Sequence, residues 1–134
     1  THALHLSDGD FSRAVDFIKK IPDRIYFEPA LEQLAGAAIA YGTGDRDSYI
    51  IVCQKTSAEA SCLRGLVNGV LEHGKPKSEY LEVIDLCKSI NLKNNDRELC
   101  YEYLISSAGG LYPPEKVKEI CNLIDKRYNK FCPN

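Results

Sequence analysis

The sequence predicts an all-α fold in which antiparallel helix pairs stack as a short right-handed α-solenoid. Apolar residues recur at helical spacing along most of the chain, and clusters of glycine, proline and asparagine separate the apolar stretches. Cys53, Cys87 and Cys121 fall 34 residues apart, and a second cysteine follows each of them. Repeat units of about this length are typical of helical-repeat proteins. We therefore expect about seven helices and three local disulfides.

The first two helices follow a polar segment, 1–10, which we expect to be frayed. Acidic residues and a glycine precede Phe11, so a helix is predicted to begin there and to end before Pro22. A second helix is predicted to begin near Phe27, because a proline suits the first turn, and to end at Gly42.

The third predicted helix, 48–55, is short. Its apolar run 49–52 would suit a strand equally well on propensity alone, and we favour a helix because the surrounding pattern is helical. Ser57 is predicted to cap a fourth helix, which runs to His73 and is stopped by Gly74.

Three further helices complete the predicted fold. The fifth covers 78–90, and an asparagine-rich loop follows it. Asp96 is predicted to cap the sixth, 97–108, which ends at Gly109. The seventh opens at the proline pair that begins with Pro113. No composition shift or linker divides the chain, so residues 1–134 are predicted to form one domain.

The repeat pattern also predicts which cysteines are joined. In each of the last three units one cysteine lies near the end of the first helix and the next lies just beyond the turn. Residues on either side of such a turn come close enough for a disulfide. Among the connectivities that six cysteines allow, this register selects Cys53–Cys62, Cys87–Cys100 and Cys121–Cys132.

The first unit provides a check on this pairing. Its matching positions hold Ile18 and Ala30, so both partners of a bridge are missing together. The rival pairing joins the second cysteine of each unit to the first of the next. It would leave Cys53 and Cys132 unpaired at distant ends of the array, which makes it the poorer choice.

The bridged helix pairs resemble the cysteine-rich secreted members of the tetratricopeptide and Sel-like repeat superfamily. The residues that carry this resemblance are the pairs Cys53–Cys62 and Cys87–Cys100 and the glycine-ended helix 62–74. The resemblance implies the stacked helix-pair architecture and names no ligand.

Charge and cysteine content limit the function classes. The formal net charge is -2, with 17 basic and 19 acidic side chains, which disfavours nucleic acid as a partner. The longest apolar runs are far shorter than the roughly 18 residues of a membrane span, so no membrane insertion is expected. Six cysteines, no methionine and an initial Thr1 predict a processed secreted or periplasmic protein, its signal peptide removed, or a piece of a longer one.

The candidate catalytic residues form no recognisable set. The histidines are His2, His5 and His73, of which two lie in the polar amino-terminal segment and one at a helix end. No zinc, redox, phosphate-loop or nucleophile motif is present, so we expect no metal, no cofactor and no catalysis. A buried carboxylate with a raised pKa at the base of a cleft would favour an enzyme instead.

Two surface features are candidates for packing or binding. Ser61, Gly65 and Gly69 form one ridge of the fourth helix, and we favour close packing of a neighbouring helix over a ligand there. Tyrosines in the last two units, chiefly Tyr80, Tyr101 and Tyr103, are predicted to contact a partner if they are exposed, and to be structural if they are buried.

The predicted function is therefore that of a non-catalytic extracytoplasmic binding or scaffolding module with a protein or peptide partner. The alternatives are a small apolar-ligand carrier with an internal cavity, and an accessory domain of a larger enzyme.

Overall fold

The computed structural model describes residues 2–134, which fold into eight α-helices and one 3-10 helix, without a strand. They are α1 (His2–Leu6), α2 (Phe11–Ile18), α3 (Arg24–Tyr41), α4 (Arg46–Gln54), α5 (Glu59–His73), α6 (Glu79–Cys87), α7 (Asn94–Leu111), α8 (Pro114–Leu123) and η1 (Lys126–Phe131). The predicted all-α fold is confirmed.

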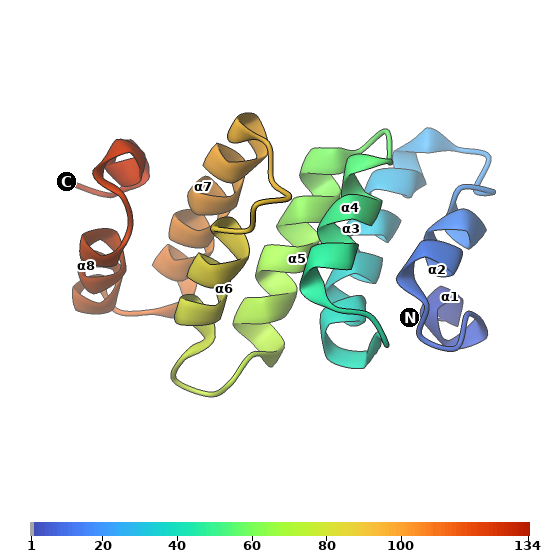
Figure 1. Cartoon of the computed structure of the whole chain (residues 1–134), viewed down its shortest axis with the longest axis horizontal. Coiled ribbons are helices and arrows are strands. Elements are labelled where there is room, and N and C mark those ends of the chain that lie inside the picture. The colour runs from blue at the N-terminus through green and yellow to red at the C-terminus, as the bar shows by residue number, and fades with distance from the viewer. Residues whose placement is uncertain (1) are drawn as a thin grey trace.

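The helices follow one another in a row along the long axis of the molecule, with the two chain ends at opposite ends of the row (Figure 1). The three long helices α3, α5 and α7 form the middle, because α5 packs against both of the others. Glu32 contacts Arg64 and Tyr41 contacts His73, so positions in α3 and α5 match at a constant offset and the two helices run in the same direction. The contacts of Arg64 with Tyr103 and of Asn68 with Ser107 show the same for α5 and α7. The handedness of the row and its solenoid geometry remain predictions.

The core runs through the row and is built from the apolar stripe of each helix. Leu31, Leu34, Leu66, Val67 and Leu104 are fully buried at the helical spacing that predicted them. Since each long helix buries residues toward both of its neighbours, the row forms one continuous core.

The three predicted disulfides are all present, and each lies within one helix pair. The Cα atoms are 5.4 Å apart for Cys53–Cys62, 5.5 Å for Cys87–Cys100 and 6.3 Å for Cys121–Cys132. These separations fall in the range that a disulfide allows. The pairing chosen from the repeat register is confirmed.

The glycine ridge of α5 packs against α3, as predicted. A Cβ atom added to Gly69 would lie 2.8 Å from the Cα of Gly36, and one added to Gly65 would lie 2.9 Å from the Cβ of Ala35. Both glycines are buried. Because no side chain separates the two helices at these positions, their backbones approach closely and no ligand groove exists on this ridge.

The amino-terminal segment differs from the prediction. Residues 2–6 form a helix rather than a frayed end, and Leu4 is buried. Asp8 and Gly9 then reverse the chain at φ values of 54° and 81°. The Gly9 carbonyl accepts a hydrogen bond from the Thr43 backbone N–H at 3.0 Å. Burial of Leu4 and this bond attach the segment to the end of α3; Thr1 lies outside the described residues.

Several helix ends also differ from the prediction. Helix α3 begins at Arg24, three residues before the predicted start near Phe27. Asp23 caps it, because its carboxylate accepts a hydrogen bond from the Ile25 backbone N–H at 3.0 Å. Ser57 does not cap α5, because the N-cap position is Ala58, and the Ser57 hydroxyl accepts a hydrogen bond from the Arg24 guanidinium at 2.7 Å. Helix α6 ends at Cys87 rather than near residue 90.

Helix α7 is longer at both ends than predicted. It begins at Asn94, so Asp96 lies inside the first turn instead of capping it. It continues through Gly109 and Gly110, where an added Cβ would meet nothing within 4 Å. A glycine ends a helix only when it leaves the helical conformation, and these two glycines remain helical. Helix α7 ends instead just before Pro113, because a proline disfavours the helical conformation of the residue before it.

Candidate functional site

The tyrosines predicted to contact a partner are core residues. Tyr80, Tyr101 and Tyr103 are between 3% and 9% exposed. Tyr101 stacks on Tyr128 with ring centroids 4.2 Å apart, and the Arg64 guanidinium covers the Tyr103 ring. They lie on the inward faces of their helices, where an apolar ring is buried. The three tyrosines therefore do not provide an exposed binding surface.

The three histidines lie on two different helices. His2 and His5 are exposed on α1, and His73 is at the end of α5. The His73 ring lies 6.1 Å from the Tyr41 ring, and its Nε2 is 3.8 Å from the carboxylate of the adjacent Glu72. This environment is that of a histidine at a helix carboxyl end.

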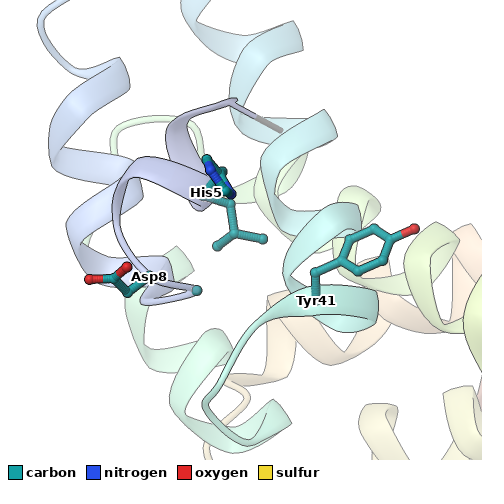
Figure 2. Close-up of a pocket in the computed structure, with 5 residues that line it drawn as sticks. His5, Asp8 and Tyr41 are labelled. Carbon is teal, nitrogen blue, oxygen red and sulfur yellow. The ribbon is translucent and has the colours of Figure 1, made fainter.

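A first surface hollow of about 400 Å³ lies where α1 meets the end of α3. Its lining includes His5, Asp8 and Tyr41 (Figure 2). The Asp8 carboxylate and the Tyr41 hydroxyl extend in opposite directions, away from each other. General acid–base or nucleophilic catalysis requires such groups to converge on one reacting atom. The hollow therefore contains polar groups but no catalytic arrangement of these three residues.

A second hollow is a groove of about 550 Å³ between the carboxyl-terminal halves of α5 and α7. It is lined by Asn68, Leu71, Glu72, Ser106, Ser107, Gly110 and Leu111. The Ser107 hydroxyl donates a hydrogen bond of 2.8 Å to Asn68 Oδ1, so the amide N–H groups of this exposed residue remain available as donors. Leu111 is 61% exposed at one end of the groove. An added Cβ at Gly110 would meet nothing within 4 Å, so there is open space at this part of the groove.

A third hollow, also about 550 Å³, lies between the end of α7, α8 and the carboxyl terminus. Its walls are largely apolar and include Tyr112, Val117 and Pro133. The Tyr112 hydroxyl donates a hydrogen bond of 3.1 Å to Glu79 Oε2. Burial and this carboxylate raise the pKa of Tyr112 to about 12, so the phenol is neutral at physiological pH.

A carboxyl pair that sequence analysis did not find joins the first turns of α5 and α7. Glu59 and Asp96 lie within hydrogen-bonding range of each other. Asp96 is 7% exposed, and Glu59 Oε1 and Asp96 Oδ2 are buried without a conventional donor among the described residues. Two carboxyl groups so placed must share a proton. The hydrogen bond to Asp96, together with burial, raises the pKa of Glu59 to about 7.

The Glu59–Asp96 pair should make the stability of the protein depend on pH. The pKa of Glu59 is raised from 4.5 to about 7 on folding, so the folded state binds more protons than the unfolded state between these values. The stabilisation is complete below about pH 4.5 and is lost as the pH rises through about 7. We expect the free energy of unfolding to fall by on the order of 1 kcal/mol over this range, since solvent screens part of the effect.

Urea unfolding of the wild type and of Glu59→Gln at several pH values measures this effect. The glutamine amide can still donate to Asp96 but does not titrate. The free energy of unfolding of the variant should therefore change little over this pH range. If it falls as much as that of the wild type, Glu59 and Asp96 do not share a proton.

Comparison with models of known families, with curated proteins and with solved structures finds no match to this chain. The resemblance to helical-repeat proteins therefore remains a prediction. Within the described residues, no helix is long and apolar enough to cross a membrane, and no group of three or more potential metal-ligating side chains occurs.

Proposed function

We propose that the protein is a non-catalytic extracytoplasmic binding or scaffolding module, and that it holds a peptide or protein segment in the groove between α5 and α7. The observation that supports this most directly is the mixed lining of the groove. The Asn68 amide and the hydroxyl of Ser106 can bond to the main chain of an extended segment. Leu71 and Leu111 suit an apolar side chain, and Glu72 suits a basic one.

The packing around the groove supports a preformed site. Helices α5 and α7 are each joined to the preceding helix by a disulfide, Cys53–Cys62 and Cys87–Cys100. A rigid groove loses little conformational freedom on binding, which favours affinity. All six cysteines are in disulfides, which is consistent with an oxidising environment. Secretion to the periplasm or outside the cell is part of the proposal.

Adjacent glycines allow a sharp test of the groove. Gly110 lines it, whereas Gly109 lines the apolar hollow beside α8, and both have open space beyond their Cα atoms. Peptides selected from a displayed random library on the wild type should carry an apolar residue beside a basic one. Gly110→Trp fills the groove and should weaken their binding by about tenfold or more. Gly109→Trp and Gly110→Ala are the matched controls and should bind normally.

Two results would contradict the peptide groove. One is a library that yields no saturable binder, and the other is equal binding of the selected peptides to Gly110→Trp. Circular dichroism of each variant shows whether the helical fold is retained.

The apolar hollow supports a second candidate, a carrier of small apolar ligands. Its lining by Tyr112, Val117 and Pro133 is the observation in its favour. A neutral apolar dye such as Nile red should then bind the wild type and Gly110→Trp equally. Loss of dye binding in Gly109→Trp would favour the carrier function, and absence of saturable dye binding to the wild type would exclude it.

A further inference from the structure

A fourth hollow, of about 270 Å³, lies where the end of α6, the first turns of α7 and η1 meet. It is lined by Lys88, Arg97, Tyr101, Asp125, Arg127 and Tyr128. Three of these side chains are basic and one is acidic, in a chain whose formal net charge is -2. The hollow is therefore a local concentration of positive charge on an otherwise slightly acidic protein.

Arg97 is held in a fixed position in this hollow. Its guanidinium donates hydrogen bonds to the carbonyls of Cys87 at 2.6 Å, Ser89 at 3.0 Å and Leu92 at 3.2 Å. These contacts use part of its donors and fix its charge beside the hollow without a carboxylate partner among the described residues. An immobilised guanidinium binds an anion with less loss of side-chain freedom than a mobile one.

Lys88 and Arg127 provide the accessible charge. Lys88 is the exposed C-cap residue of α6, and the described part of the chain offers its ammonium no carboxylate within ion-pair distance. Arg127 is bound on one side to Asp125, at 3.3 Å between Arg127 Nε and Asp125 Oδ1, and its side chain is 71% exposed. Asp125 thus orients Arg127 but neutralises only one of the three basic groups.

The aromatic wall of the hollow is neutral. Tyr101 is 3% exposed and stacks on Tyr128, which fixes both rings. Burial raises the pKa of Tyr101, so this wall of the hollow carries no negative charge that would repel an anion. The hollow lies beside both the positive end of the α7 dipole and the negative end of the α6 dipole, so the basic side chains determine the sign of its field.

We propose that this hollow is a binding site for an oxyanion of the phosphate or sulfate class, which Lys88, Arg97 and Arg127 bind by charge beside the neutral rings of Tyr101 and Tyr128. The site shares no residue with the groove between α5 and α7, so an experiment can contradict one proposal without affecting the other. Phosphate and sulfate groups have several oxygen acceptors, which match donors that converge from three segments.

Titration of the ¹⁵N-labelled protein with sodium phosphate and with sodium sulfate, at constant ionic strength maintained with chloride, tests the site by NMR. We expect saturable amide shifts confined to the end of α6, the start of α7 and η1, with a Kd on the order of 1 mM. Phenyl phosphate distinguishes the source: tighter binding than inorganic phosphate indicates a monoester ligand, and equal binding indicates the free anion.

The matched control comes from the preceding helix pair. Lys55 is the C-cap residue of α4, as Lys88 is of α6, and Lys55 is exposed and outside the hollow. Lys88→Gln should raise the Kd by about tenfold, and Lys55→Gln should leave it unchanged. Arg127→Gln is a second variant with the same expected loss. Equal effects of the two lysine substitutions, or shifts that chloride alone reproduces, would overturn the proposal.

Discussion

Replacing Gly69 with alanine should lower the free energy of unfolding by about 2 to 3 kcal/mol. The added Cβ would lie 2.8 Å from the Cα of Gly36 and 3.0 Å from Cγ1 of Ile39. The first of these neighbours is backbone, so it cannot move aside by changing a rotamer, and α3 and α5 must separate. Helix propensity alone would favour alanine by about 1 kcal/mol, so the packing cost must exceed that gain.

Gly65→Ala should have an effect of the same sign and at least the same size. Its added Cβ would collide with the Glu32 carbonyl oxygen and would lie 2.9 Å from Glu32 C. Such contacts are shorter than van der Waals distances allow, and both atoms belong to the backbone of α3. The two variants together should cost less than the sum of the two effects, because one separation of the helices relieves both clashes.

The matched control is Gly110→Ala in α7. An alanine Cβ there meets nothing within 4 Å, so only the propensity gain remains and stability should rise by about 0.5 kcal/mol. Chemical denaturation of the three variants and the wild type gives the signs directly. A stabilised Gly69→Ala would contradict the backbone contact between α3 and α5.

The sequence predicts most of the architecture because the relevant signals are local. Apolar spacing and capping residues identify the helices, and cysteine spacing together with the missing pair at Ile18 and Ala30 selects the disulfides. The predicted packing of the glycine ridge is also correct, because Gly65 and Gly69 lie in the middle of α5 among apolar residues, where close packing offsets the cost of glycine.

Features that depend on distant partners were not predictable in this way. Ser57 has an ordinary capping position, yet it bonds to Arg24 instead. Glu59 and Asp96 are far apart in the sequence and meet because α5 and α7 pack side by side. Tyrosine composition cannot separate a core ring from an exposed one, and Tyr103 proves to be core.

The candidate binding surfaces were the least predictable part. The α7 side of the groove between α5 and α7 is lined by Ser106, Ser107, Gly110 and Leu111, residues that the sequence pattern placed near or beyond the end of the sixth helix. The basic hollow combines Lys88, Arg97 and Arg127 from three segments. No local periodicity brings such residues together, so they become visible when the helix packing is known.

Removal of the Cys87–Cys100 disulfide is expected to be the most destabilising change. The bridge closes a segment with a sequence separation of 13, for which restriction of the unfolded chain contributes about 3 kcal/mol. Both cysteines are buried, so Cys87→Ala with Cys100→Ala also loses packing. The thermal midpoint should fall by about 10 °C or more, as measured by circular dichroism. A decrease of a few degrees or less would contradict this expectation.

Combining Arg97→Ala with removal of the disulfide shows whether the bridge stabilises the folded state or restricts the unfolded chain. Its guanidinium binds the carbonyls of Cys87, Ser89 and Leu92, so it holds the same connection between α6 and α7 in the folded state. If the disulfide acts mainly on the unfolded chain, its removal and Arg97→Ala should have additive effects within about 0.5 kcal/mol. A larger coupling energy would mean that the bridge positions the connection for Arg97. Because these atoms are close neighbours, additivity here would be strong evidence for the unfolded-state origin.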